Sequence, residues 1–219
     1  MFPMAIDVYD YHSFLKAVAK FQGFCRFDDV KLCKRELAMF FAMTTHESGY
    51  NTGSTKIPKW RQGFYYVKEM KCASHGGPAC DYKSTGWSHD TWPPVAGKQY
   101  YGRGPLQITW NYNYGAFSSV VYGDQNVVLK NPDLVHTDGY HAFLSALWFY
   151  MEPQAPKPSM HEIATKMYKP NHSDIKAGLG ANFGSATMVI NGGLECTTKD
   201  HKENAGSQAR ASYYKAFLH

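Results

Sequence analysis

The chain has 219 residues, of which 44% are hydrophobic and 19% charged, a composition typical of a globular protein rather than a disordered one. Its formal net charge is +5, but the lysines and arginines are scattered and form no basic run of the kind that binds nucleic acid. No segment approaches the ~18 consecutive apolar residues of a membrane-spanning helix. The sequence therefore predicts no nucleic-acid partner and no membrane partner, and its length suits one domain over residues 1–219.

Two helices are predicted in the first fifty residues. Asp10 can cap the first, whose apolar residues at positions 11, 14, 18 and 21 share one face until Gly23 ends it. The second is predicted from Lys34 to Thr45 and is apolar nearly all round, which indicates a central, buried helix. Glu36 in this helix is interpreted as an ordinary surface residue.

The stretch from Ser48 to Pro105 has no sustained helical period and is interrupted by many glycines and prolines. A loop region this long inside a compact domain is usually functional. Beyond it, helices are predicted to begin near Asn111 and to cover residues 138–150, 160–167, 186–190 and 208–218. The sequence therefore predicts a mainly α fold with a cleft built from loops, and no linker that would separate two domains.

The cysteines favour an oxidising compartment. Cys25 lies close in sequence to Cys33, and Cys72 to Cys80, so each pair can close a small-loop disulfide. The alternative is a set of reduced thiols in a cytosolic protein. No Cys or His cluster has the spacing of metal ligands, so no metal site is expected. Cys196 is left over, either because its partner lies outside this chain or because it is a buried free thiol.

Two glutamates stand out among the acidic residues. Glu47 ends the most apolar helix and enters the loop region, where burial beside Met43 would raise its pKa, as a general acid requires. The alternative for Glu47 is a hydrogen bond to a local backbone N–H. Glu69 lies within the irregular stretch and can face the same cleft, or it can form a surface ion pair with Lys68 or Lys71. Two carboxylates across a cleft are the minimum machinery for hydrolysing a glycosidic bond.

A segment beginning at residue 100 gives the most specific signal. It reads Tyr-Tyr-Gly-Arg-Gly-Pro-Leu-Gln, in which aromatic, amide and arginine groups alternate with glycine and proline, as the wall of a polar-ligand site requires. With this string the chain resembles glycoside hydrolase family 19, the chitinases. Residues 38–47 resemble the first catalytic segment of that family, and residues 189–196, Val-Ile-Asn-Gly-Gly-Leu-Glu-Cys, match a third motif. The resemblance covers residues 10–218, with the three motifs in the family's order.

The resemblance implies a bilobal, lysozyme-like helical fold and an endochitinase that cleaves β-1,4 linkages with inversion. Glu47 then matches the general acid and Glu69 the general base, while Thr109 stands where the family usually has a serine holding the attacking water. His46 and Arg210 match residues that orient and charge-balance the carboxylates, and Arg210 is expected to keep the base ionised. The remaining matches are residues that contact the substrate, namely Trp92, Gln107, Tyr112, Asn113, Gln154, Lys157 and Asn191.

By the same resemblance the substrates are chitin and chitooligosaccharides, no cofactor is needed, and the protein is expected to be a secreted monomer. The first residues lack the basic start and apolar core of a signal peptide, so the chain is interpreted as a mature fragment. Two alternatives stay open: a peptidoglycan hydrolase on the same scaffold, and a catalytically silent chitin-binding protein. Retention of both Glu47 and Glu69 argues against the silent protein.

Overall fold

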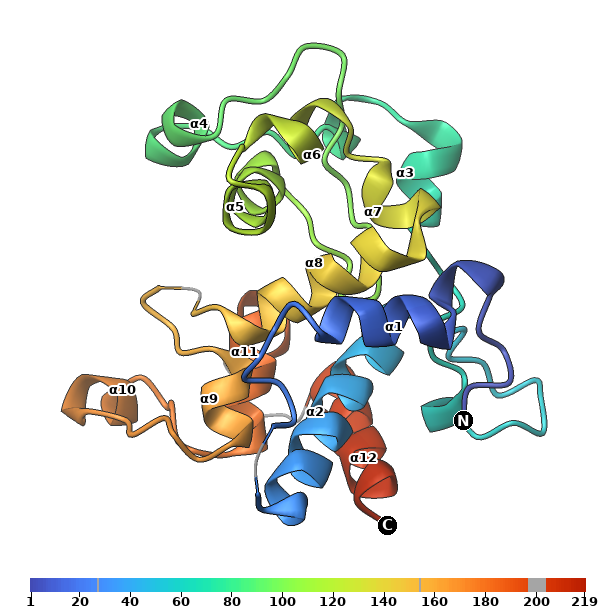
Figure 1. Cartoon of the computed structure of the whole chain (residues 1–219), viewed down its shortest axis with the longest axis vertical. Coiled ribbons are helices and arrows are strands. Elements are labelled where there is room, and N and C mark those ends of the chain that lie inside the picture. Colours follow the sequence, from blue (N-terminus) through green and yellow to red (C-terminus); the bar gives the residue numbers. More distant parts are fainter. Residues whose placement is uncertain (27, 154, 197–203) are drawn as a thin grey trace.

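The structure is a computed structural model that describes residues 1–26, 28–153, 155–196 and 204–219. Almost all of its regular structure is helical (Figure 1). The longer helices are α1 (Tyr11–Val18), α2 (Val30–Ser48), α5 (Asn111–Tyr122), α8 (Gly139–Met151), α11 (Phe183–Glu195) and α12 (Ala205–Leu218). The shorter ones are α3 (Met70–His75), α4 (Trp87–Thr91), α6 (Asn126–Lys130), α7 (Leu134–Thr137), α9 (Met160–Ala164) and α10 (His172–Lys176). The mainly α fold is therefore confirmed.

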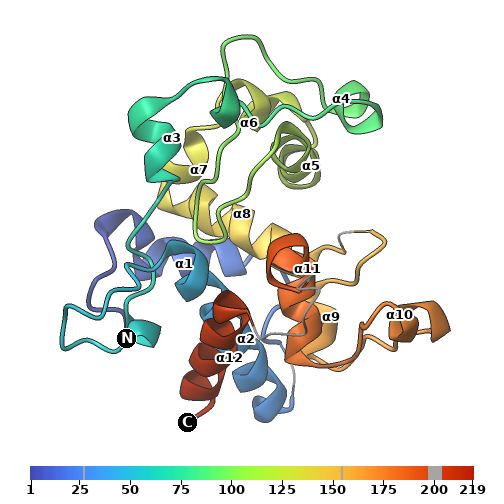
Figure 2. The ribbon, with the colours of Figure 1, turned by 180° about the vertical axis from the view of Figure 1, so that it is seen from behind.

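The helices form two lobes, as Figures 1 and 2 show from opposite sides. Helices α3 to α7 gather in the first lobe, and α2, α9, α11 and α12 gather in the second, with both chain termini. Helix α8 lies between the lobes, and α1 packs along it. Within the described ranges, no helix combines the length and the apolar composition that crossing a membrane requires.

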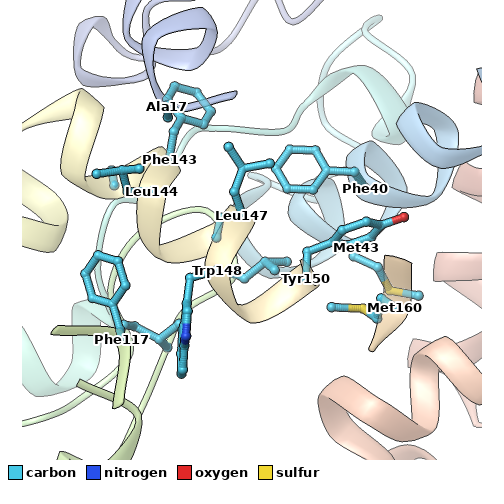
Figure 3. Packing of buried hydrophobic residues seen from close by; sticks show 14 of the residues in the cluster. Ala17, Phe40, Met43, Phe117, Phe143, Leu144, Leu147, Trp148, Tyr150 and Met160 are labelled. Atoms are coloured by element: carbon cyan, nitrogen blue, oxygen red, sulfur yellow. The ribbon is translucent and has the colours of Figure 1, made fainter. Parts of the chain in front are cut away.

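Helix α8 joins the lobes because it is apolar on every side, so both lobes can bury a face of it. Trp148 packs on Phe117 of α5 in the first lobe, with ring centroids 5.8 Å apart. Tyr150 packs edge-on against Phe40 of α2 in the second lobe, at 5.4 Å. Figure 3 shows these aromatic side chains leaving α8 in different directions. One continuous core therefore extends through both lobes.

Helix α2 is central and largely buried, as predicted, but it is longer at both ends than residues 34–45. Its start is fixed by Asp29, whose side chain accepts a hydrogen bond from the backbone N–H of Lys31 at 2.8 Å. Its end at Ser48 keeps Glu47 within the last helical turn. The helix, rather than a flexible loop, therefore fixes the position of the Glu47 carboxylate.

Glu36 corrects a sequence prediction, because it is fully buried rather than exposed. Its Oε2 accepts a hydrogen bond from the backbone N–H of Cys25 at 2.7 Å. Its Oε1 pairs with Nδ1 of His161 on α9. Both partners lie outside α2, so the periodicity of this helix alone gave no sign of them.

Other element boundaries also differ from the predictions. The region from Ser48 to Pro105 contains α3, α4 and 3-10 turns, because helices of one or two turns leave no sustained period. Helix α1 ends at Val18 rather than near Gly23, and Tyr11, predicted on its apolar face, is 73% exposed. The helices predicted at 186–190 and 208–218 begin earlier, at the capping residues Asn182 and Asn204.

The disulfides match the cysteine spacing. Cys25 is bonded to Cys33 just before α2, and Cys72 is bonded to Cys80 across the turn that follows α3. Cys196 is unpaired and exposed, so of the two alternatives predicted for it the buried free thiol is wrong. The second disulfide lies next to Glu69, where it fixes part of the site described below.

Candidate active site

A cavity of about 1030 Å³ is lined by side chains from both lobes. Its volume lies at the upper end of the ~300–1,000 Å³ of pockets that hold drug-sized ligands, so it has room for more than one sugar unit. The predicted site residues that line it are Glu47, Glu69, Trp92, Gln107, Thr109, Tyr112, Asn113, Lys157 and Asn191. His46 and Arg210 lie behind Glu47, and Gln154 falls outside the described residues.

The Glu47 carboxylate meets a charged partner. Its Oε1 accepts a hydrogen bond from Nη2 of Arg210, whose side chain is fully buried, whereas 20% of the Glu47 side chain is exposed toward the cavity. The local pattern indicated only apolar neighbours, because Arg210 belongs to α12 at the far end of the chain, and only the family resemblance pointed to it. Glu47 therefore lies between a buried cation on one side and open cavity on the other.

Arg210 is held by a second carboxylate, that of Glu195 at the end of α11. The guanidinium donates from Nη2 to Oε1 at 2.7 Å and from Nε to Oε2 at 3.0 Å. Burial alone would raise the pKa of Glu195, but the hydrogen bonds and charge of Arg210 outweigh it and hold that pKa below its usual value. The resemblance matched Arg210 to both catalytic carboxylates and implied that it keeps Glu69 ionised, whereas its hydrogen bonds to carboxylates go to Glu47 and Glu195.

His46 and Asn191 complete this cluster. Nδ2 of Asn191 donates to Oε1 of Glu195 at 2.8 Å, and Nε2 of His46 lies 3.9 Å from the same oxygen. Burial, and then the charge of Arg210, lower the pKa of His46, so its ring is neutral at neutral pH. Asn191 lies at a break in the helical backbone of α11, at φ −146° and ψ 33°, and also lines the cavity.

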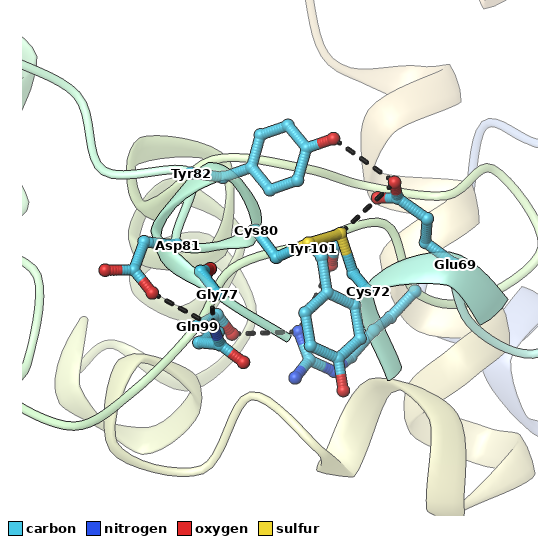
Figure 4. Close-up of a disulfide and its surroundings, with 9 residues drawn as sticks. Glu69, Cys72, Gly77, Cys80, Asp81, Tyr82, Gln99 and Tyr101 are labelled. Atoms are coloured by element: carbon cyan, nitrogen blue, oxygen red, sulfur yellow. Dashed lines mark hydrogen bonds between the residues drawn. A yellow bond between two sulfur atoms is a disulfide. The ribbon is translucent and has the colours of Figure 1, made fainter. Parts of the chain in front are cut away.

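Glu69 approaches the cavity from the first lobe, at the residue that precedes α3. Figure 4 shows its Oε1 beside the Tyr82 hydroxyl and the sulfur of Cys72, each at 3.3 Å. The disulfide sulfur has no proton to give, so the Tyr82 hydroxyl is the donor. Burial, and then the charge of Glu69, raise the pKa of Tyr82, which therefore keeps its proton.

The backbone on the other side of Glu69 is tied to the segment that begins at residue 100. The N–H of Glu69 donates to the Gly102 carbonyl at 2.8 Å, and the N–H of Gly104 donates to the Val67 carbonyl at 2.8 Å. Gly104 has φ +77°, and a Cβ there would lie 3.0 Å from Oγ of Ser145. A side chain at this position would therefore disturb the segment that supports Glu69.

Arg103 anchors the same segment through hydrogen bonds to its backbone carbonyls. It is 2% exposed and donates to the carbonyls of Gln99 and Tyr101, at 3.0 and 3.1 Å. It also donates to the Tyr114 hydroxyl at 3.0 Å and to Asp133 at 2.8 Å. Its guanidinium therefore serves the architecture of the loop and not the cavity, although it stands in the most family-specific string of the sequence.

This loop and the first turn of α5 then present three polar side chains to the cavity. Nε2 of Gln107 donates to the Gly104 carbonyl, Oγ1 of Thr109 to the Gln107 carbonyl, and Nδ2 of Asn113 to the Thr109 carbonyl, each at 2.8 Å. Gln107 has φ +49° and Trp110 has φ +77°, conformations that L side chains rarely adopt. Strain of this kind concentrates at functional sites, where the surrounding structure holds it in place.

The remaining predicted residues form the flanks of the cavity. The Tyr112 ring lies nearly parallel to that of Trp110, at 6.4 Å and 17°. Nζ of Lys157 donates to the carbonyl of Met188 at 3.0 Å, close to the helix break in α11. Across the described ranges, no three His, Cys, Asp or Glu side chains gather closely enough to hold a metal ion.

Sequence reasoning missed three residues of the site. Glu195 follows Asn191 by four positions on a helix, a spacing that puts the two side chains on one face and could have revealed the contact. Tyr82 and Trp87 gave no such signal, because both lie in the irregular region. Trp87 lines the cavity although it matches none of the quoted family motifs.

A family model described as "Chitinase class I" matches residues 3–219. The chain therefore belongs to glycoside hydrolase family 19, as its three motifs predict. Among solved structures, chitinase C from Streptomyces griseus HUT6037 has a TM-score of 0.72 and 28% identity, covering 99% of this chain and 71% of that one. This match confirms the lysozyme-like helical fold.

The curated relatives are longer than this chain. Endochitinase 2 of Solanum tuberosum is 38% identical over 211 residues, which cover 96% of this chain and 62% of the relative. Inactive chitinase-like protein 1 of Hevea brasiliensis is also 38% identical, over 212 residues that cover 95% of this chain and 62% of that protein. The chain thus spans about 62% of the length of these relatives, and they include a protein named as inactive.

Proposed function

We propose that this chain is the catalytic domain of an inverting endochitinase, in which Glu47 is the general acid and Glu69 the general base. The observation that carries the proposal is that these two carboxylates reach one cavity from different lobes. Family membership adds the substrate class, a β-1,4 polymer of N-acetylglucosamine. Because one relative is named inactive, membership of the family does not by itself imply catalytic activity. The presence of both glutamates in the cavity is the stronger argument for hydrolysis.

The reaction follows from this placement. Protonated Glu47 gives its proton to the glycosidic oxygen as the bond from that oxygen to C1 breaks. Ionised Glu69 takes a proton from a water whose oxygen bonds to C1 from the opposite face of the sugar. The products are a shorter chain with an inverted C1 hydroxyl and a second chain with a free hydroxyl. This geometry needs the two carboxyl groups roughly 6.5–9.5 Å apart, which leaves room for the water.

Arg210 and Glu195 support the Glu47 half of this cycle. Once Glu47 has lost its proton, the buried Arg210 cation stabilises the carboxylate that remains. Glu195 stays ionised because Arg210 lowers its pKa. The Glu195 carboxylate in turn fixes the guanidinium of Arg210 and balances its charge. On the other side, the Tyr82 hydroxyl and the Gly102 carbonyl hold Glu69 by its side chain and its backbone.

Thr109 has the chemistry needed to orient the water. Its hydroxyl proton is committed to the Gln107 carbonyl, so the oxygen is left to accept a hydrogen bond from the cavity. We expect Thr109→Val to lower kcat on chitin oligomers by about tenfold, the worth of one such hydrogen bond, with KM changed less than twofold. Steady-state kinetics on a chitin hexamer measure both.

Thr109→Ser is the matched control, since it keeps the hydroxyl and is the residue that family members usually carry at this position. It should retain most of the turnover. Equal kcat values in Thr109→Val and the unmodified protein would remove Thr109 from the mechanism.

The test of the proposed function is a pair of assays on the same preparation. We expect release of short fragments from chitin oligomers and from colloidal chitin. A clearing of bacterial cell walls with no release from chitin would instead show a peptidoglycan hydrolase. Oligomer binding without any cleavage would show a silent chitin-binding protein.

The setting of this activity is also part of the proposal. We infer a secreted monomer in which residues 1–219 form one catalytic domain. The two disulfides support an oxidising compartment, and the continuous core through both lobes supports one domain.

A further inference from the structure

Trp87 is an exposed aromatic residue in the same cavity as Glu47 and Glu69. It is the first residue of α4, and 73% of its surface is accessible to water. Single exposed apolar residues are common and need no explanation by themselves. Trp87 differs because it lines the cavity that holds the two proposed catalytic carboxylates, together with other exposed apolar side chains, Val120 at 57% and Leu194 at 75% exposure.

The Trp87 ring is held in position. It meets the Trp92 ring edge to face, with centroids 5.5 Å apart and planes at 83°. Trp92 in turn lies directly on Gly115 of α5, where an added Cβ would be 2.3 Å from its Cδ1. The Thr91 hydroxyl donates to the Trp87 carbonyl at 2.8 Å and closes the turn of α4. The exposed ring is therefore supported from behind, which limits the entropy lost when a ligand covers it.

Trp87 belongs to α4, a helix on a different side of the first lobe from α3. Figures 1 and 2 show α3 and α4 on opposite sides of the first lobe, and Glu69 directly precedes α3. A polymer whose scissile bond lies at Glu69 therefore has further units to place before it reaches α4. Trp92, Trp110 and Tyr112 line the cavity as well, so Trp87 is one of several aromatic side chains there.

We propose that Trp87 is an outer binding platform for N-acetylglucosamine units of the substrate chain, and that it makes the protein favour long chains over short ones. The inference rests on the proposed function for its substrate class. Sugar rings have apolar C–H faces that cover an indole ring, while their hydroxyl edges stay in water. Short oligomers end before α4 and gain nothing from Trp87, whereas longer chains cover it.

The test compares a chitin trimer with a chitin hexamer in Trp87→Ala. We expect kcat/KM on the hexamer to fall roughly 5- to 10-fold, the worth of one covered indole face, and kcat/KM on the trimer to stay within twofold. Trp87→Tyr keeps an aromatic ring and should retain most of the preference for the hexamer. Tyr11→Ala is the matched control, because Tyr11 is also 73% exposed but lies on α1 and not in the cavity.

Binding separates this inference from the proposed function. In the Glu47→Gln background, calorimetric titration with the hexamer should show weaker binding when Trp87→Ala is added, by a similar factor. An equal loss on trimer and hexamer, or no loss on either, would overturn the platform while leaving the hydrolase intact. Failure of the unmodified protein to cleave any chitin would overturn the proposed function, and the titration would still decide whether Trp87 binds the oligomer.

Discussion

Glu47→Gln is expected to lower turnover of chitin oligomers by about 10²–10⁴ and to leave their binding within a few-fold of the unmodified protein. The amide has nearly the same shape as the carboxyl group but cannot give a proton to the leaving oxygen. Arg210 keeps its hydrogen bonds to Glu195, so the cluster around position 47 stays in place. Kinetics on a chitin hexamer, with calorimetric titration, measure both quantities.

Glu162→Gln is the matched control for this substitution. Glu162 closes the capping box of α9 with Ser159, and glutamine is equally accepted at that position of the box, so the helix is preserved. Glu162 does not line the cavity, and its variant should keep full turnover. If Glu47→Gln also kept near full turnover, Glu47 would not be the acid.

Glu69→Gln should lose turnover by a similar factor, because the amide cannot take the proton of the attacking water. The roles of the two glutamates can then be distinguished by the reagent that restores the reaction rate in each variant. A hexamer bearing a dinitrophenyl leaving group needs no proton from the acid, so it should restore much of the rate in Glu47→Gln and little in Glu69→Gln.

Azide tests the role of Glu69 in the variant Glu69→Ala. The shorter alanine side chain leaves space beside C1 of the sugar, where azide can replace the attacking water. Azide attacks C1 without losing a proton, Glu47 still protonates the departing oxygen, and the product is a glycosyl azide. Restoration of rate by azide in the Glu47 variant rather than in the Glu69 variant would mean that the two roles are exchanged. Full turnover in Glu69→Gln would place the base elsewhere.

The sequence predicted the parts of the site that depend on local pattern. The apolar helix that ends near Glu47 predicted α2, and its last turn delivers Glu47 to the cavity. The string from Tyr100 predicted a wall of polar groups, and Gln107 and Thr109 lie there. These predictions succeeded because helical periodicity and glycine-rich turns are properties of short segments.

Sequence reasoning failed where a contact joins different elements. The buried carboxylate of Glu36 has Cys25 and His161 as partners, and neither position bears on the pattern of α2. For the same reason the residue pattern did not show that Arg210 bonds to Glu47, since only the packing of α12 on α2 brings the two together. Buried polar groups need partners, but composition does not say which partners.

The anomeric configuration of the first product tests the central claim most directly. A single displacement, in which Glu69 acts through water and not on the sugar, must convert a β-1,4 linked hexamer into product with an α configuration at C1. Proton NMR of a fresh digest, recorded before mutarotation mixes the anomers, should show the α-anomer signal rising first. A β-anomer that appears first would mean a double displacement or help from the substrate's acetamido group, and would contradict the roles given to Glu47 and Glu69.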